Sequence, residues 1–195
     1  MPLPIGHSLA GYAIYLASQK ESPHKIREVI LCIFLANLPD LDYLPGFLIG
    51  YPNYFHHGIS HSIGFAVFCG ILGMIYSKWL IKEDIKKGFF FFSGIYFSHI
   101  FLDFICADDS IPYGEKLLWP FSNNYYISPI TLFAGVHKSN LSSDFILSLF
   151  NLYNLHAIFI EFIILSPVVI GVQLYRSKKN QMRPLENGRY KNKKL

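Results

Sequence analysis

The chain has 195 residues, of which 52% are hydrophobic and only 15% are charged, whereas soluble domains carry about 25% charged residues. This composition excludes an ordinary water-soluble globule and predicts an integral membrane protein. The formal net charge of +4 comes from residues 176–195, which hold eight Lys or Arg and one Glu, while the rest of the chain has a net charge of −3. Because this basic tail follows an apolar segment directly, we expect it to contact anionic lipid and expect no nucleic acid partner.

The cysteines and the N-terminal stretch exclude two further features. Cys32, Cys69 and Cys106 lie in apolar runs without a CxxC pair, so we expect small buried side chains rather than disulfides or a thiolate metal site. The first residues lack a basic region, and His7 and Gly11 interrupt their apolar stretch. We therefore expect no cleaved signal peptide.

Long apolar runs predict membrane-spanning helices, each close to the about 20 residues that cross a bilayer core. The predicted spans are residues 58–80, 88–107 and 157–175. Ser166-Pro167 predicts a kink in the third span, which membrane helices tolerate. We therefore predict a membrane-embedded domain over residues 1–175 and a basic cytoplasmic tail over residues 176–195.

Shorter elements surround these spans. Residues 7–18 and 26–38 predict helices that pack against the bundle, the second ended by Pro39. Residues 107–141 are rich in turn formers and aromatic residues and predict irregular structure. Ser143-Asp144 can cap a helix that runs to about Leu155. The fold class is accordingly an all-α integral membrane helical bundle of about five to six helices.

Charge placement predicts the orientation, because basic residues mark the cytoplasmic side. Basic clusters lie at residues 20–27, at residues 78–87 and in the tail, and an up-and-down path places all three on one side. The residues with metal-ligand chemistry fall at the opposite helix ends: His7, Asp40, Asp42, His56, His61, His99 and Asp103. No single spacing requires this, so the common end is the strongest argument for one shared site.

Two pairs of these residues have the spacing of one helix face. His99 and Asp103 are four residues apart, hence about 5–6 Å from each other. Placing a charged side chain inside a membrane-spanning apolar run costs at least about 2.5–3.5 kcal/mol of free energy. Either a shared cation or a buried His–Asp pair must offset this free energy. His57 and His61 have the same spacing, and His56 joins them only if it precedes the helix. The alternative for these three is interfacial histidines open to water.

The remaining candidates are less specific by themselves. Asp40 and Asp42 follow Pro39. Either the turn geometry there lets both carboxylates point away from the helix end, or the two residues are ordinary turn residues. His7 alone would be an ordinary histidine near the N-terminus. Imidazole with carboxylate and no thiolate is a common ligand set for Zn²⁺ and also suits Mn²⁺ or Fe²⁺. Seven candidates exceed the three or four that one zinc needs. We therefore expect a divalent metal, zinc above others, with room for more than one ion.

These residues stand in motifs that resemble the YdjM family of membrane-bound metal-dependent hydrolases. That family shows an N-terminal His, LPD-hydrophobic-D, HRG-x-THS, SH-hydrophobic-x-x-D and a G…LLWP segment. The chain has His7 in PIGHSLAG, LPDLD at 38–42, HHGISHS at 56–62, SHIFLD at 98–103 and GEKLLWPF at 114–121. The resemblance implies a hydrolase of a bacterial or archaeal cell membrane and gives His56 more weight than His57 as a ligand.

Two positions depart from the family pattern. His57 replaces the usual Arg, which removes a permanent cation that could hold a phosphate, and His57 could instead be an extra ligand. Ser60 replaces Thr, a conservative change. The ligand order also resembles zinc-dependent phospholipase C, which would imply a multinuclear zinc site and phosphodiester cleavage. The residues in that order are His7, Asp40, His61, His99 and Asp103.

The sequence therefore predicts a metal-dependent hydrolase acting on an ester or phosphoester of a small molecule or a membrane lipid. Asp40 or Asp42 would ligate metal or act as general base toward the attacking water, and Trp119-Pro120 would shape the pocket rim. Two alternatives stay open. A transporter of metal ions or protons is one, because intramembrane His and Asp mark ion paths, although the path should then continue to the basic end. A non-catalytic membrane adaptor with a structural metal is the other.

Overall fold

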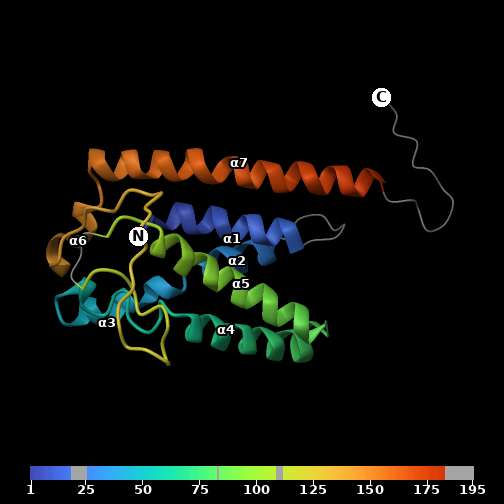
Figure 1. The fold of residues 1–195 in the computed structure, drawn as a ribbon, viewed down its shortest axis with the longest axis horizontal. Coiled ribbons are helices and arrows are strands. Elements are labelled where there is room, and N and C mark those ends of the chain that lie inside the picture. The colour runs from blue at the N-terminus through green and yellow to red at the C-terminus, as the bar shows by residue number, and fades with distance from the viewer. Residues whose placement is uncertain (19–25, 83, 109–111, 183–195) are drawn as a thin grey trace.

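The computed structural model describes the chain except for residues 19–25, 83, 109–111 and 183–195 (Figure 1). Within the described residues it has seven α-helices and no β-sheet, which confirms the predicted all-α class. The α-helices are α1 Pro4–Ser18, α2 Ile26–Ala36, α3 Tyr43–Leu48, α4 Ile63–Tyr76, α5 Ile85–Phe104, α6 Ser142–Ser148 and α7 Leu152–Met182. Three short helices join them: η1 Pro39–Asp42, η2 Pro52–Tyr54 and the π-helical η3 Ser77–Ile81.

Five helices run side by side along the long axis of the molecule: α1, α2, α4, α5 and α7 (Figure 1). Helix α1 contacts α2, α5 and α7, and α5 also contacts α2 and α4, so α1 and α5 form the centre of the bundle. The short helices α3 and α6 and the irregular segments gather at the end that holds the N-terminus (Figure 1). The C-terminal end of α7 points to the other end.

Two helical stretches of the described chain are long and apolar enough to cross a membrane, Ile63–Leu80 and Leu152–Lys179. They correspond to the first and third predicted spans. Helix α2 and the segment Pro39–Leu48 pass the same test together, with a bend of 52° at the break between them, and form a third candidate. The segment expected only to pack against the bundle can therefore belong to a broken span.

Helix α5 covers the second predicted span but is not apolar enough to qualify alone. Lys86 and Lys87 in its first turn and His99 and Asp103 near its end interrupt the apolar run. These polar residues are accommodated because α5 packs against α4, α1 and α2. The second predicted span thus packs against three helices and leaves one face exposed, including Phe90, Phe97 and Phe101.

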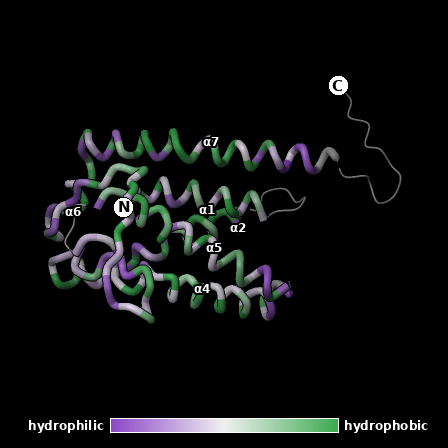
Figure 2. Tube along the Cα trace, viewed as in Figure 1, coloured by the Kyte–Doolittle hydropathy of each residue, from purple (hydrophilic) through white to green (hydrophobic). Residues whose placement is uncertain are grey.

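Hydrophobic residues line the middle of the bundle, and hydrophilic residues gather at both of its ends (Figure 2). One end carries the turn between α4 and α5 with Lys78, Lys82 and Lys86, together with the last turns of α7. The predicted basic residues Lys20 and Lys25, and the tail beyond residue 182, lie outside the described residues. The described lysines of the α4–α5 turn therefore lie at the end opposite the candidate ligands.

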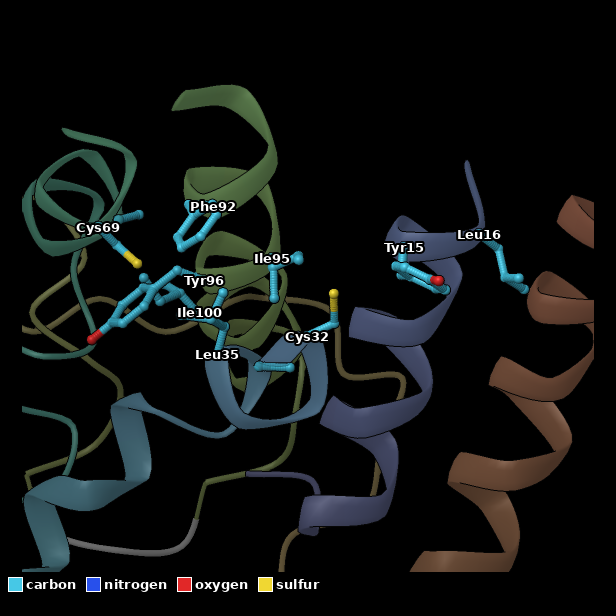
Figure 3. Packing of buried hydrophobic residues seen from close by; sticks show 11 residues of the cluster. Tyr15, Leu16, Cys32, Leu35, Cys69, Phe92, Ile95, Tyr96 and Ile100 are labelled. Atoms are coloured by element: carbon cyan, nitrogen blue, oxygen red, sulfur yellow. The ribbon is translucent and has the colours of Figure 1, made fainter. Parts of the chain in front are cut away.

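The core between α1, α2, α4 and α5 consists of apolar side chains (Figure 3). Tyr15 and Leu16 of α1 and Ile95 of α5 are completely buried in it. Leu16 lies on the side of α1 that faces α7 in Figure 3. Cys32, Cys69 and Cys106 are free and buried, so the prediction of small hydrophobic cysteines is confirmed.

Several predicted helix boundaries were wrong. The helix from residue 26 ends at Ala36, and the helix expected from Ser143-Asp144 to Leu155 is divided into α6 and the start of α7. Asn151 causes the division, because its side chain accepts the N–H of Asn154 and caps a new helix. The residue preceding α6 is Leu141, which makes no side-chain cap.

Helix α7 is longer than the predicted third span. It begins five residues earlier than expected, continues through Pro167 and extends past the predicted boundary at residue 175 to Met182. Residues 107–141 are irregular as predicted, with two isolated bridges, Cys106 to Phe133 and Glu115 to Tyr126.

Candidate metal centre

Four parts of the fold bring all seven predicted ligands to one end of the bundle. His7 lies in α1, Asp40 and Asp42 in η1, and His99 and Asp103 in the last turns of α5. His56 and His61 lie in the turns between η2 and α4. All four histidines and Asp103 are buried. The clustering that charge placement suggested is therefore present in the tertiary structure.

An inner group of ligand atoms comes from Asp40, His61, His99 and Asp103, and these atoms all lie within 4.8 Å of one another. His99 Nε2 is 3.1 Å from Asp103 Oδ2 and 3.5 Å from Asp40 Oδ1. His61 Nε2 is 3.3 Å from Asp103 Oδ2, 3.7 Å from Asp40 Oδ1 and 3.2 Å from His99 Nε2. In a tetrahedral site with metal–ligand distances of 2.0–2.1 Å, neighbouring ligand atoms are about 3.3 Å apart. The spacing of the inner group thus suits a single cation.

The end of α2 orients His99. Because the last carbonyls of a helix have no partner within the helix, the carbonyl oxygen of Ala36 is free to accept the Nδ1–H of His99 at 2.7 Å. The other ring nitrogen, Nε2, then carries a lone pair. Asp42 orients His61 in the same way, because its Oδ2 lies 3.1 Å from His61 Nδ1. Two lone pairs consequently face each other, and a cation between them removes their repulsion.

The described structure also leaves buried oxygen and nitrogen atoms of this cluster without hydrogen-bond partners. They are both carboxylate oxygens of Asp103, Oδ1 of Asp40 and both ring nitrogens of His7. His7 Nε2 lies 3.5 Å from Asp103 Oδ1, and the His7 ring stacks on His99 with ring centroids 3.7 Å apart. Because buried polar atoms are normally satisfied, these five atoms fit a bound metal ion.

An outer group shares one residue with the inner group. It consists of Asp40, Asp42 and His56. His56 Nδ1 is 3.0 Å from Asp42 Oδ1 and 4.0 Å from Asp40 Oδ1. Asp40 therefore lies between the two groups, which fits two neighbouring cations with a shared carboxylate. A third grouping, His56, His57 and His61, overlaps both.

The carboxylates around His61 favour a positive charge at the inner group, which a metal ion would supply in place of a ring proton, whereas His56 in the outer group is kept neutral. Burial lowers the pKa of His61, but the carboxylates of Asp42, Asp103 and Asp40 outweigh it and raise this pKa well above the usual 6.5. Burial, with the neighbouring His57, holds the pKa of His56 well below 6.5. A neutral imidazole is the form that ligates metal, and the surplus of negative charge selects a cation.

His57, the residue in place of the family's arginine, stands beside this cluster. Its backbone has a φ of 61°, and its Nδ1 lies 3.6 Å from Asp108 Oδ2. It lines a small pocket together with Asp103, Asp108 and Glu115. Glu115 is buried, and neither of its carboxylate oxygens has a hydrogen-bond partner in the described structure.

The histidines without a strong case in the sequence stay outside the cluster. The His137 ring stacks on Tyr153, and His156 is exposed on α7. His24 and Asp109 lie outside the described residues. Glu161 is structural: its carboxylate accepts the N–H groups of Leu3 at 2.7 Å and Gly6 at 3.0 Å.

Sequence reasoning missed three residues that contact the cluster. Ser60, noted only as a conservative replacement, donates from Oγ to Asp42 Oδ2 at 2.7 Å. The Tyr43 ring stacks on His56 with centroids 4.1 Å apart. Lys138 Nζ donates to the Tyr43 hydroxyl at 2.6 Å. The HHGISHS motif could have indicated Ser60, but nothing in the sequence around Lys138 signals its position.

The Trp119-Pro120 segment packs on the start of α4. The N–H groups of Ile63 and Gly64 donate to the carbonyl oxygens of Leu117 and Trp119. The GEKLLWPF motif thus covers the helix that follows the histidine turn. Its role at a pocket rim stays a prediction.

Comparison with known proteins now decides the family, since the match to the YdjM inner membrane protein family covers residues 1–180. The chain belongs to the YdjM inner membrane protein family. The family match and the candidate spans make it a membrane protein with a buried His/Asp cluster that could hold metal. No curated protein and no solved structure matched the chain.

Proposed function

We propose that this YdjM family protein is a membrane-bound metal-dependent hydrolase that cleaves an ester or phosphoester bond at the His/Asp cluster. The observation that carries the proposal is the inner group, in which two oriented imidazole nitrogens 3.2 Å apart face the carboxylates of Asp40 and Asp103. Zinc is the first candidate, because imidazole and carboxylate in tetrahedral spacing are its usual ligands. A second ion in the outer group is part of the proposal.

The residues of the chain have distinct roles in this scheme. A bound divalent cation lowers the pKa of a water ligand toward about 7 and polarises a phosphoryl or acyl oxygen. Asp42 holds the rings of His56 and His61 in place, and Ser60 holds Asp42. Asp40 faces both groups and retains an unpartnered buried oxygen, so it either ligates metal or accepts a proton from the attacking water.

The bundle core favours a one-sided site over a transport path. Beyond the cluster, the space between α1, α2, α4 and α5 is filled by apolar side chains such as Ile100, Ile95 and Leu16 (Figure 3). A path for metal ions or protons would need polar groups there. A closed structural site would need only four ligands, whereas seven candidate ligands gather here.

Metal analysis tests the first half of the proposal. The protein is purified in detergent without chelator, and bound metal is measured by mass spectrometry for wild type, His99→Ala, Asp103→Ala and His156→Ala. We expect stoichiometric metal in wild type and in His156→Ala, whose side chain is exposed and far along the chain from the cluster, and a loss in the other two variants. Wild-type protein that keeps its fold but retains no stoichiometric metal contradicts the proposal.

Substrate turnover tests the second half of the proposal, which is hydrolysis. Metal-loaded wild type is incubated with a panel of carboxyl esters, phosphodiesters and phospholipids, with Asp40→Asn as the inactive reference. Hydrolysis that depends on both the metal and Asp40 supports the enzyme. Metal retention without turnover of any substrate supports the structural adaptor, and metal flux into liposomes supports the transporter.

A further inference from the structure

Three polar side chains converge on one sulfur atom beside the outer group. The Tyr43 hydroxyl lies 2.9 Å from the Sδ atom of Met1, His56 Nε2 lies 2.8 Å from it, and Lys138 Nζ lies 3.3 Å from it. A thioether is only a weak acceptor. Three possible hydrogen-bond donors thus surround an atom that can accept only weak hydrogen bonds.

Lys138 is held in this position by its backbone neighbours. The buried Asn154 accepts the N–H of His137 at 2.8 Å and donates to the carbonyl oxygen of the same residue at 2.8 Å. On the other side, Ser148 Oγ accepts the N–H of Ser139 at 2.7 Å. Because both flanking residues are fixed to α6 and α7, the lysine is placed by the fold rather than by chance contact of a long side chain.

Lys138 is attracted by the carboxylates of the nearby cluster, but it forms no salt bridge with any of them among the described residues. Its ammonium donates to Tyr43 and lies over the Tyr43 ring at 5.2 Å, but it makes no ion pair with a carboxylate. Because a partly buried cation is stabilised by a directly paired anion, an anionic ligand could pair with this ammonium once a metal ion offsets the carboxylates of the cluster. Tyr43 accepts from Lys138, so its own proton points toward the sulfur.

His56 connects this pocket to the candidate metal centre. Its Nδ1 faces Asp42 in the outer group, and its Nε2 faces the sulfur. With Nδ1 as a metal ligand, the proton of the neutral ring is on Nε2 and can be donated into the pocket. A group bound in the pocket would therefore lie one imidazole ring away from a cation of the outer group.

We infer that Tyr43, His56 and Lys138 form an anion pocket that binds a phosphate group of the substrate, with the Met1 side chain leaving when the phosphate enters. This inference rests on the proposed function and narrows its substrate class from esters in general to phosphoesters. The pocket adjoins the apolar side chains of Phe145, Phe47 and Leu149, which suits either a lipid phosphate or a soluble one.

Binding of inorganic phosphate tests the pocket without any turnover. Calorimetric titration compares wild type, Lys138→Met, Lys138→Arg and Lys78→Met, with the metal content of each sample measured in parallel. Lys78 is the matched control, because it also lies over an aromatic ring, Trp79 at 5.4 Å, but at the basic end of the bundle. We expect Lys138→Met to weaken phosphate binding about tenfold or more, since it removes a charge-assisted hydrogen bond. Lys138→Arg and Lys78→Met should bind nearly as wild type does.

Two results of the titration would overturn the inference. Equal phosphate binding by wild type and Lys138→Met means that the pocket does not hold phosphate, and an equal loss in Lys78→Met means that only net charge matters. If Lys138→Met fails to fold, Tyr43→Phe replaces it, and unchanged phosphate binding in that variant is then decisive. Absence of metal in wild type defeats the proposed function, while the phosphate titration still reports on the pocket.

Competition distinguishes the two sources of phosphate. Bound inorganic phosphate is displaced with short-chain phosphatidic acid in detergent or with glycerol phosphate in solution. Stronger displacement by the first assigns a lipid substrate, and stronger displacement by the second assigns a soluble one. Failure of both compounds to displace phosphate counts against a substrate pocket.

Discussion

The Nε2 atoms of His61 and His99 lie 3.2 Å apart, although the two residues are separated by 38 positions and belong to different elements. Each ring is turned toward the other by a partner on its remaining nitrogen, Asp42 for His61 and the Ala36 carbonyl for His99. Such outer contacts fix which nitrogen can ligate a metal. They also make the cluster testable at residues that do not ligate metal themselves.

Ser60 should matter to the metal site through Asp42. Replacement of Ser60 by Ala removes the hydroxyl that donates to Asp42 Oδ2 at 2.7 Å and also lies 3.1 Å from His61 Nδ1. Because outer contacts of this kind typically affect metal affinity about 10–100-fold, we expect at least about tenfold weaker metal binding, measured by competition with a chromophoric chelator. Ser60→Thr keeps the hydroxyl, matches the family pattern and should bind as wild type does. Equal affinity of Ser60→Ala and wild type would show that Asp42 needs no such support.

Glu161 should stabilise the start of α1 and with it the position of His7. Its two carboxylate oxygens accept the N–H groups of Leu3 and Gly6, and all of these groups are buried. Loss of both charge-assisted bonds in Glu161→Ala should cost about 2–4 kcal/mol and lower the thermal midpoint in detergent. Glu161→Gln can accept only one of the two N–H groups and should fall between wild type and Ala. A Gln variant less stable than the Ala variant contradicts this account.

Gly64 and Gly94 form a matched pair of helix glycines with opposite expectations. A Cβ at Gly64 would collide with the carbonyl oxygen of Trp119 and would lie 2.8 Å from Pro120 Cδ. Gly64→Ala should therefore separate the GEKLLWPF segment from α4 and destabilise the protein by about 1–3 kcal/mol. A Cβ at Gly94 meets nothing within 4 Å, so Gly94→Ala should be neutral or stabilise α5 by up to about 1 kcal/mol. Thermal unfolding of the two variants in the same detergent compares them, and equal midpoints contradict the packing.

Glu115 should make stability fall as pH rises. Burial, with the nearby Asp103, raises the pKa of Glu115 well above its usual value of 4.5. The folded state then holds a proton that the unfolded state loses, so stability is lost as pH rises from the unfolded pKa through the raised folded pKa. Glu115→Gln removes this dependence, and its thermal midpoint relative to wild type should increase with pH above about 4.5. A difference that stays constant across this range contradicts the raised pKa.

The orientation in the membrane also has a direct test. The basic end should be cytoplasmic, so a reporter fused to the C-terminal tail should read cytoplasmic. Phe121 is 95% exposed at the ligand end, and Phe121→Cys should react with an impermeant thiol reagent from the outer side of intact cells. Lys82→Cys at the basic end should react only after permeabilisation. The three native cysteines are buried and give little background, and the reverse labelling pattern would invert the topology.

Periodicity and composition were enough to predict the class of fold, because apolar runs of bilayer length form helices irrespective of their neighbours. Periodicity and composition did not predict helix boundaries that depend on a single capping side chain. Asn151 caps the start of α7 and so divides the helix that was expected to run through it. The lysines of α5 were visible in the sequence, but its central position depends on the packing of α1, α2 and α4 against it.

For the site, charge placement along the sequence was enough to predict that His7, Asp40, His61, His99 and Asp103 gather at one end of the helices, and the family motifs named the same residues. Which atoms of these residues meet depends on how the helices pack. The Ala36 carbonyl that turns His99 belongs to a helix 63 positions earlier in the chain, and no spacing rule connects the two. The position of Lys138 likewise depends on a distant segment, because Asn154 of α7 hydrogen-bonds the backbone of the preceding residue, His137. Hydrogen bonds between distant segments depend on how helices pack, and a linear pattern carries no record of that packing.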